Sequence, residues 1–245
     1  MFKEQRTDRI LEIIRENKYV TVDYLVSRLH YSPATIRRDL VYLANLGLIN
    51  KSYGGVSYVN ARPTIVREHE DISGKIAICK KAADLINDGD TIFIDGTTTS
   101  YFLGEVLLKK KNVTVYTANL KLAIFLGERK VNCFVCGGQV LDSTMLGGVY
   151  TCDLLEKTHF DVSFFSVGQV SLDGFYNYSD AYYIYLKTVT KRSDKSVLLL
   201  TTQKIYQPSK RYFSSLSDFN TVITNGTFKQ ETIDKFPTVE FISVK

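Results

Sequence analysis

From Lys75 onward the chain alternates short apolar runs with longer segments whose apolar residues recur at helical spacing, and this alternation limits the possible folds most strongly. Helical spacing covers residues 76–86, 101–108 and 120–126. The apolar runs expected to form strands are 91–94, 113–117, 131–136, 162–167, 197–200, 221–224 and 239–243. Such alternation predicts an α/β domain with a mainly parallel sheet, whose ligands bind at the carboxyl ends of the strands.

The first sixty residues follow a different pattern, with three short helical segments. In RILEIIREN the apolar residues mark one face of a first helix, and Thr21 is the expected N-cap of a second. The third begins at Ser32 and Pro33, because the serine hydroxyl accepts from free N–H groups of the first turn and proline lacks one such donor. Gly47 marks its end. This layout predicts a helix-turn-helix whose third helix enters the major groove of DNA.

The expected third helix has an apolar face and a polar face. A projection at about 100° per residue groups Ile36, Leu40 and Leu43 on the buried side. Arginine binds guanine or phosphate, and threonine contacts a base edge or the DNA backbone. After the helix, Gly54 and Gly55 turn two short strands into a wing. The residues predicted to contact DNA are Ser32, Ala34, Thr35, Arg37, Arg38, Tyr42, Lys51 and Tyr53.

The charge distribution favours a nucleic-acid partner at the N-terminal end. The net charge is +5, and residues 1–58 contribute +3 of it, with nine Lys or Arg against six Asp or Glu. A basic excess at one end is the distribution that nucleic-acid binding requires. On charge alone, a small helical interaction module with a solvated basic face is an open alternative.

The segment SPATIRRDL, with the closing Tyr53-Gly54-Gly55, resembles the N-terminal winged helix of the DeoR family of bacterial transcriptional regulators, over some fifty contiguous residues. The larger part also resembles the DeoR sensor, which is related in fold to ribose-5-phosphate isomerase and CoA-transferase-like proteins. We therefore expect a winged helix-turn-helix DNA-binding domain at 1–59 and an α/β effector-sensing and oligomerisation domain at 74–245. Residues 60–73 mix charge with one proline and are expected to form a linker.

The loop DGTTTS follows the expected strand 91–94 and precedes a helical segment. Backbone amides next to glycine, threonine hydroxyls and a helix N-terminus together favour an anion such as phosphate, although a simple capped turn fits the loop equally well. The resemblance implies that this loop helps to line a pocket for a phosphorylated sugar, where lysine is a suitable point charge. The residues implied are Asp95, Gly96, Thr97, Thr98, Thr99, Asn119, Gly137, Gly138, Lys187 and Lys204.

The second half of the chain departs from the family pattern at three places. Residues 168–170 read Gly-Gln-Val where the family usually has a Gly-Ala-Asp-like turn. Tyr182 and Tyr183 stand where the family has paired acids, and Thr201 replaces an aspartate. Losing carboxylates removes acceptors for sugar hydroxyls, and the tyrosines add bulk. We expect phosphate anchoring to be retained and sugar recognition to be altered or absent.

Cys133 and Cys136 form a C-x-x-C pair, a spacing also found in redox and metal sites. No second pair or nearby histidine completes four metal ligands, so VNCFVCGG is interpreted as a buried strand with cysteine as a small hydrophobe. No apolar run approaches the roughly 18 residues of a membrane span, and the N-terminus has no secretory core. We expect a cytoplasmic protein with no membrane partner, no metal and no cofactor.

Three functions are compatible with these patterns. The first is a repressor of a carbohydrate-metabolism operon that binds a double-stranded DNA operator as a homo-oligomer, dimer or higher, and is relieved by a phosphorylated sugar or related small metabolite. The second is a DNA-binding regulator whose large domain has lost sensing and serves oligomerisation, with the tyrosines of YNYSDAYYIY between protomers. The third is an isomerase-like enzyme with Asp95 or Asp180 as base; the missing acids disfavour it, and we expect no enzymatic activity.

Overall fold

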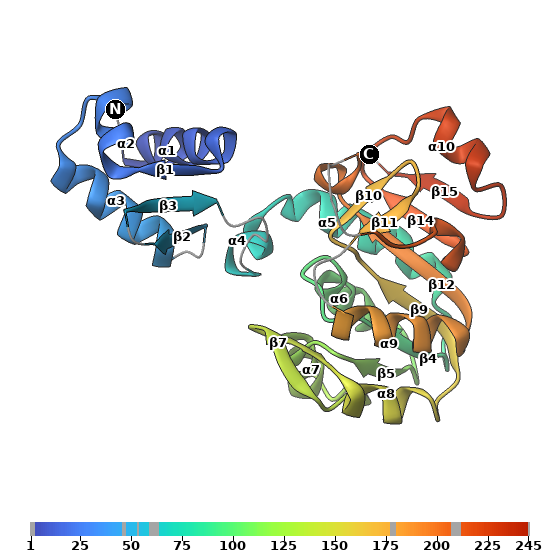
Figure 1. The fold of residues 1–245 in the computed structure, drawn as a ribbon. Helices are drawn as coiled ribbons and strands as arrows, with labels where there is room; N and C mark the ends of the chain where they lie inside the picture. The colour runs from blue at the N-terminus through green and yellow to red at the C-terminus, as the bar shows by residue number, and fades with distance from the viewer. Residues whose placement is uncertain are drawn as a thin grey trace. The chain divides into compact units, whose positions relative to one another are not determined.

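The computed structural model of the protein divides into two compact units, Met1–Glu70 and Asp71–Lys245 (Figure 1). It describes residues 3–45, 48–52, 54–58, 64–176, 180–206 and 212–244. Each unit has its own hydrophobic core, and each is therefore described separately.

The first unit contains a three-helix array and a small antiparallel sheet in the order β1-β3-β2. Its elements are α1 (Lys3–Asn17), β1 (Tyr19–Thr21), α2 (Val22–Leu29), α3 (Pro33–Asn45), β2 (Ile49–Ser52) and β3 (Gly55–Tyr58). This is the predicted winged helix-turn-helix, with β2 and β3 as the wing. A further helix, α4 (Thr64–His69), occupies part of the segment expected to be a linker, whose residues 60–63 lie outside the described part of the chain.

Side-chain caps set the starts of α2 and α3. The Thr21 hydroxyl accepts from the Tyr24 N–H at 3.1 Å, and the Ser32 hydroxyl accepts from the Thr35 N–H at 3.2 Å. Both caps were expected from the sequence, whereas the expected helix end at Gly47 lies outside the described residues. The predicted apolar face of α3 is confirmed, since it joins the core of this unit: Ile10, Ile14, Val20, Leu25, Ile36, Leu40, Leu43, Ile49 and Val56.

The second unit is built on a parallel sheet in the order β15-β14-β12-β9-β4-β5-β6. The strands are β4 (Thr91–Ile94), β5 (Thr114–Thr117), β6 (Cys133–Val135), β9 (Phe160–Phe165), β12 (Ser193–Leu200), β14 (Thr221–Thr224) and β15 (Glu240–Ser243). In the centre of the sheet Ile94 lies opposite Thr117 on one side and Phe164 on the other. The predicted α/β domain with a mainly parallel sheet is confirmed.

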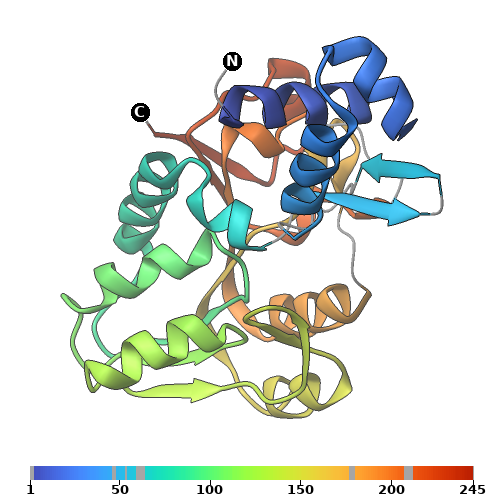
Figure 2. The ribbon, with the colours of Figure 1, turned by 90° about the vertical axis from the view of Figure 1, so that its left-hand side faces the viewer.

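Helices cover both faces of this sheet (Figures 1 and 2). One face carries α5 (Ile72–Ala82), α6 (Leu103–Leu107) and α7 (Leu120–Glu128), and the other carries α8 (Val149–Leu155) and α9 (Asp180–Lys191). Side chains alternate along β4, so Ile92 and Ile94 pack towards α5–α7 while Phe93 packs towards α9. Helix α10 (Gln230–Lys235) precedes β15.

Short strands not expected from the sequence lie near the carboxyl ends of the main strands. The hairpin β7 (Gln139–Asp142) and β8 (Met145–Gly147) docks after β5, where the Leu146 N–H donates to the Ala118 carbonyl at 2.8 Å. A second antiparallel sheet joins β10 (Gln169–Ser171), β11 (Gly174–Tyr176) and β13 (Tyr212–Ser214). Strands this short carry too few alternating positions for a periodic signal.

The interpretation of VNCFVCGG as a buried strand is wrong for the strand as a whole, although Cys136 is buried as expected. Strand β6 is an edge strand, and within the described ranges it pairs with β5 alone. The side chains of Phe134 and Val135 are 45% and 43% exposed. An apolar run has the same appearance in sequence whether or not a neighbouring strand covers it, and here one side of the strand has no neighbour.

Candidate functional site

Helix α3 presents short and basic side chains on the face opposite its core residues. Thr35 is half-buried, and Tyr53 lies outside the residues that the structure describes. The other side chains predicted to contact DNA are exposed: Ser32, Ala34, Arg37, Arg38, Tyr42 and Lys51.

Ser32 has a structural role as well as an exposed position. Its hydroxyl lies 2.9 Å from the Thr35 hydroxyl and accepts from the Thr35 N–H. This cap satisfies one of the free donors of the first turn, and it fixes the end of the helix that a groove-reading element directs towards DNA.

Asp39 anchors α3 to α1, a role that the sequence did not reveal. Its carboxylate is buried and accepts from Arg6 twice, with Nε–Oδ2 at 2.5 Å and Nη2–Oδ1 at 3.1 Å. The Asp39 carboxylate raises the pKa of the Arg6 guanidinium, which also lies over the Tyr31 ring at 5.0 Å. Two-point pairing of this kind fixes orientation as well as distance. The two residues are 33 positions apart, so no local pattern marks them as partners.

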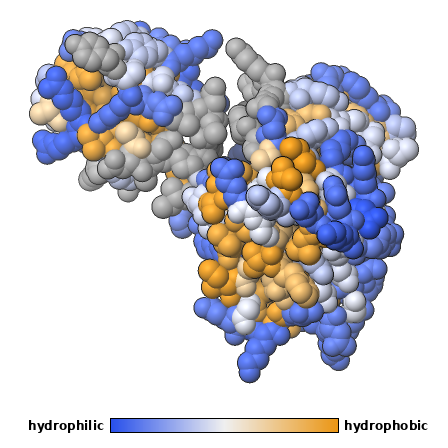
Figure 3. All heavy atoms as spheres, turned by 60° about the horizontal axis from the view of Figure 1, so that its bottom comes forward, coloured by the Kyte–Doolittle hydropathy of each residue, from blue (hydrophilic) through white to orange (hydrophobic). Residues whose placement is uncertain are grey.

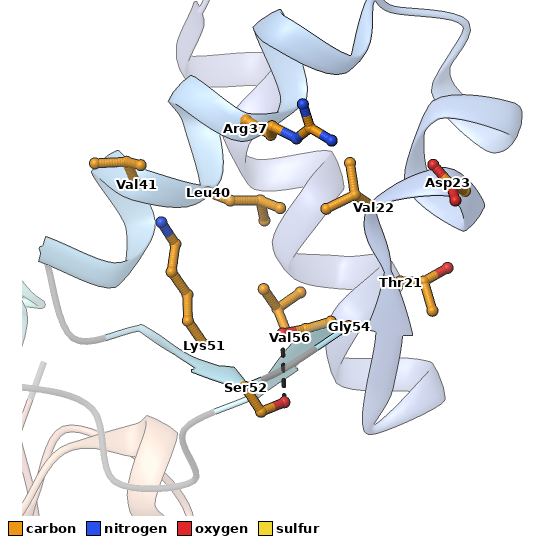
Figure 4. Close-up of a pocket in the computed structure, with 11 residues that line it drawn as sticks. Thr21, Val22, Asp23, Arg37, Leu40, Val41, Lys51, Ser52, Gly54 and Val56 are labelled. Carbon is orange, nitrogen blue, oxygen red and sulfur yellow. Dashed lines mark hydrogen bonds between the residues drawn. The ribbon is translucent and has the colours of Figure 1, made fainter.

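A groove of about 520 Å³ lies between α3 and the wing (Figure 4). Val22, Leu40 and Val56 are among its apolar lining residues. Arg37 enters it from α3 and Lys51 from β2, so cations from two elements border one apolar floor. Phosphate oxygens and sugar carbons of a nucleic-acid strand match this combination of charge and apolar surface.

The loop of residues 95–100 lies at the point where the chain order of the sheet reverses. From β4, the next strands β5 and β6 extend to one side, and β9, β12, β14 and β15 lie on the other. Ligands of open α/β sheets bind at the carboxyl ends of the strands that flank such a reversal. Ser166, at the end of β9, and Asn119, after β5, both contact this loop. The loop therefore lies where open α/β sheets commonly bind their ligands.

Four protein groups surround the Asp95 carboxylate, which is fully buried. The N–H and hydroxyl of Thr97 approach Oδ1 at 3.1 and 2.8 Å. The Ser166 N–H and the Tyr182 hydroxyl approach Oδ2 at 2.7 and 2.6 Å. Asp95, predicted to contact the effector, thus binds the protein's own groups and holds β4, β9 and α9 together.

The pKa of Asp95 is raised, because burial penalises its charged form more than the surrounding hydrogen bonds favour it. The same burial, followed by the nearby Asp95 charge, raises the pKa of Tyr182. The Tyr182 hydroxyl lies 2.5 Å from the Ser166 carbonyl as well as 2.6 Å from Asp95 Oδ2. A phenol has one proton for these two acceptors, so both contacts can be hydrogen bonds at once only when Asp95 carries a proton and donates to the Tyr182 hydroxyl.

Two backbone amides and a lysine ammonium are donors at this loop that could serve an anion. In the described part of the chain, no acceptor bonds the N–H groups of Thr98 and Thr99. The Lys204 ammonium lies 3.3 Å from the Thr99 hydroxyl and donates to the Ser166 hydroxyl at 2.6 Å. Adjacent amides beside a cation are the elements of a phosphate site.

Asn119, after β5, supports the loop, and Gly96 within the loop lies against the β7–β8 hairpin. The Asn119 side chain caps α7 by accepting from the Leu122 N–H at 3.1 Å, and its amide donates to the Thr97 carbonyl at 3.4 Å. At Gly96, an added Cβ would lie 2.3 Å from Met145 and 2.9 Å from the Ala118 carbonyl. Gly96 is thus required by the close approach of β8, and both residues shape the site.

The remaining predicted effector residues have other partners. The Gly137 carbonyl accepts from the Thr151 hydroxyl at 2.5 Å, and a Cβ on Gly138 would collide with Thr151 and Gly147. Lys187 donates to both carboxylate oxygens of Asp218, at 2.8 and 2.7 Å. The structure therefore groups residues 95–99 with Asn119 and Lys204, and it places Lys187 in a separate ion pair.

The cysteines are free, and burial raises the pKa of Cys133 to about 11 and of Cys136 to about 12. Thiols with such pKa values are poor nucleophiles and poor metal ligands near neutral pH. Among the described residues, no three His, Cys, Asp or Glu side chains are placed to hold a metal ion together. Nor does any helix among them have the length and apolar character to cross a membrane.

Comparison with known proteins covers both units. Residues 6–62 match the model of the DeoR-like helix-turn-helix domain, and residues 70–226 match that of the DeoR C terminal sensor domain. The lactose phosphotransferase system repressor of Streptococcus mutans is 31% identical over 92% of this chain and 93% of its own. The glycerol-3-phosphate regulon repressor of Escherichia coli K12 is 30% identical over 82% of this chain and 81% of its own. Ribose 5-phosphate isomerase A from Neisseria gonorrhoeae superposes with a TM-score of 0.40 and 18% identity, over 54% of this chain and 52% of that structure.

Proposed function

Since the chain belongs to the DeoR family of transcriptional regulators, we propose that it represses a carbohydrate-metabolism operon and that a phosphorylated sugar relieves the repression. The relatives named above are a lactose phosphotransferase system repressor and a glycerol-3-phosphate regulon repressor. Both names are those of repressors, one of a sugar phosphotransferase system and one of a glycerol-3-phosphate regulon, and they support the same class of function here.

The DNA-binding part of the proposal is supported by the exposed basic face of α3. Arg37 and Arg38 are exposed in the N-terminal half of the helix, while Asp39 fixes the helix to α1. Arginines on a rigid helix are suited to guanine or to phosphate, because their orientation is set before DNA arrives. Lys51 on the wing adds a cation from the other side of the groove.

The effector-binding part is carried by one observation, the pair of Thr98 and Thr99 amides beside the Lys204 ammonium. These donors suit the phosphate of an effector. Asp95, a natural acceptor for sugar hydroxyls, is occupied by Thr97, Ser166 and Tyr182. We therefore expect the phosphate to supply most of the affinity and the sugar hydroxyls to supply less.

Thr99 is fully buried in this structure, so the loop and its cover must rearrange for an anion to reach its amide. A ligand that binds one conformation better than another shifts the balance between them. If the conformation with bound effector holds the recognition helices at a spacing that does not fit the operator, the effector releases the protein from DNA.

Fluorescence anisotropy with DNA from the region upstream of the protein's own gene tests DNA binding. We expect sequence-selective binding that weakens steeply as salt is raised, because phosphate contacts release counterions. A thermal-shift screen with hexose, pentose and triose phosphates tests sensing, since a ligand specific to the folded state raises the melting temperature. Binding that is equal for operator and scrambled DNA contradicts the regulator, and the absence of any ligand shift contradicts the sensor.

One alternative has a specific observation in its favour, namely that the large domain has lost sensing and serves oligomerisation. Tyr182 and Tyr185 fill the space beside Asp95 and are almost fully buried. Their burial also means that these two tyrosines form core within one chain, so the protomers would have to meet through other residues. Calorimetry with the same phosphates separates the sensing regulator from this alternative. Heat released on saturable binding of one phosphate requires a working sensor site.

We infer that the protein is not an isomerase. A catalytic carboxylate must reach the carbon-bound proton of the substrate. Asp95 is enclosed by protein donors, and Asp180 is an exposed residue at the start of α9. An assay for interconversion of pentose phosphates is expected to show no turnover above a protein-free control.

A further inference from the structure

The two edges of the main sheet differ in chemistry. The β15 edge begins with the charged residue Glu240, and Phe241 and Ile242 are half-buried. The β6 edge lies within a stretch, Val131–Leu141, that contains no charged residue and no proline. Sheet edges that face water are usually protected by charge, proline or a covering element. The β6 edge lacks the first two protections.

The β6 backbone has an open hydrogen-bonding side. The Val115 N–H donates to the Asn132 carbonyl, and the Cys136 N–H donates to the Thr117 carbonyl, both at 2.9 Å. Because backbone groups alternate between the two sides of a strand, residues 132, 134 and 136 face β5. Cys133 and Val135 therefore direct their N–H and C=O groups to the open edge.

Apolar side chains surround this edge. Helix α7 packs against β6, and the β7–β8 hairpin leads directly into α8. Figure 3 brings this end of the sheet forward and shows hydrophobic residues gathered over it. The exposed apolar side chains of these elements form what we call the β6 patch: Ile124, Phe134, Val135, Val140, Val149 and Tyr150.

The size of the β6 patch fits a protein interface. Its side chains are between 43% and 79% exposed. These fractions correspond to roughly 600 Å² of apolar surface, the upper end for a monomer's largest patch. A stable interface buries about 800 Å² on each partner, including its polar rim.

We propose that the β6 patch joins two copies of this chain, with the β6 strands antiparallel and a two-fold axis at Phe134. In this register Cys133 of each copy lies opposite Val135 of the other, and each pair exchanges both of its outward backbone bonds. Phe134 lies opposite its own counterpart. Within each chain its ring already stacks on Tyr116, with centroids 4.8 Å apart, so four aromatic rings align across the axis.

A second copy is the occupant that the geometry favours. The outward-facing residues Cys133 and Val135 lie on either side of Phe134, so two β6 strands can pair about a two-fold axis at Phe134. The residues of the β6 patch are uncharged, so two copies of the patch can meet without like-charge repulsion. A two-fold interface brings the same surface of both copies together. The role of this dimer rests on the proposed function, since a two-fold dimer presents two recognition helices to a palindromic operator.

The molar mass of the full chain in solution, measured by light scattering without DNA, tests the interface. We expect an even multiple of 27.8 kDa for the unchanged protein and half that mass for Val135→Lys, because the lysine places like charges across the axis. Leu172→Lys is the matched control, since Leu172 is 37% exposed on the β10–β11 hairpin. It is expected to keep the unchanged mass, and circular dichroism melting checks that both variants fold.

The register is tested by crosslinking. In the proposed pairing the two residues at position 134 have Cα atoms about 4.5 Å apart, within the range of a disulfide. Phe134→Cys combined with Cys133→Ser is expected to form a covalent dimer under mild oxidation, and Leu172→Cys combined with Cys133→Ser is expected to remain uncrosslinked.

A monomeric unchanged protein, or an oligomer that Val135→Lys leaves intact, overturns the interface. An oligomer that Val135→Lys dissociates but that does not crosslink through position 134 overturns the register. Either result leaves the proposed function standing if operator DNA is still bound selectively in the anisotropy assay. Loss of selective DNA binding with an intact dimer would instead contradict the proposed function alone.

Discussion

Helix α3 and the loop of residues 95–100 both carry polar residues at the start of a helical segment, but these side chains are exposed in α3 and enclosed by protein groups in the loop. In α3, Arg37 and Arg38 face solvent and are available to a ligand before it binds. In the loop, Asp95 is enclosed by groups from β9 and α9. The proposed DNA-binding surface is therefore separable from folding, whereas the proposed sensor site is part of the fold of its own domain.

The largest expected effect comes from Asp95→Asn, which tests whether the loop is structural. An amide can accept at one position only, so the Ser166 N–H or the Thr97 donors lose their acceptor in a buried site. We expect the free energy of unfolding of the second unit to fall by up to about 3 kcal/mol. Hydrogen exchange at β4 and β9 measures this loss, and exchange at α1 and α3 should not change. Asp173→Asn, which breaks an exposed pair with Lys235, is the control and should cost less than about 1 kcal/mol.

Arg37→Ala tests the other side of the comparison. The exposed guanidinium is expected to contribute about 1–3 kcal/mol to operator binding, or roughly a 5- to 150-fold change in Kd, and almost nothing to stability. Anisotropy titration measures the affinity and urea unfolding measures the stability. Arg15→Ala removes an exposed arginine from α1 and should leave selective binding unchanged. If Arg37→Ala unfolds the domain instead, the proposed separation of binding from folding does not hold.

The sequence predicted these two regions unequally, and the reason is the range of the interactions. The face of α3 follows from spacings of three and four residues, so Ile36, Leu40 and Leu43 could be assigned to the core before the structure was known. The partner of Asp95 at Tyr182 is 87 residues away, and Lys187 meets Asp218 across 31 residues. Such pairs depend on the order of strands in the sheet, which hydrophobic periodicity does not determine. The exposed edge at β6 was missed for the same reason.

Protonation of Asp95 gives the second unit an unusual pH dependence. Its folded pKa is raised above the ordinary value of 3.8, so the folded state binds the proton more tightly than the unfolded state. This contribution to stability is fully present below the unfolded pKa and is lost as the pH rises through the folded pKa, by at most about 1.4 kcal/mol per pH unit. The difference in unfolding free energy between the unchanged protein and Asp95→Asn should therefore shrink as the pH rises above 3.8. A difference that grows with pH would show that Asp95 is ionised in the folded protein.

Lys204→Met and Lys187→Met compare two lysines of the sensor domain that the family resemblance treats alike. Lys204 reaches the Thr99 hydroxyl, whereas Lys187 is paired with Asp218. Removing Lys204 should weaken binding of a phosphorylated sugar about tenfold, the equivalent of one charge-assisted hydrogen bond. Lys187→Met should leave the Kd unchanged. Calorimetry with the ligand found by thermal shift measures both Kd values. A larger loss of affinity in Lys187→Met would indicate that the phosphate binds near Lys187 and not at the Thr98 and Thr99 amides.

Ser32→Ala brings folding and binding together at one residue, and its effect is expected to be the smallest. The hydroxyl caps α3 through the Thr35 N–H, so its removal should cost about 1 kcal/mol of stability in the first unit. The first turn of α3 then frays more often, and the affinity for operator DNA should fall by a similar free energy because the N-terminal end of the helix is the end that reads the groove. Ser32→Asp separates the two roles. Aspartate caps a helix as well as serine does and should restore stability, but its negative charge beside DNA phosphate should not restore binding. Urea unfolding and anisotropy on the same three proteins give both quantities, and recovery of DNA affinity in Ser32→Asp would mean that Ser32 acts through the cap alone.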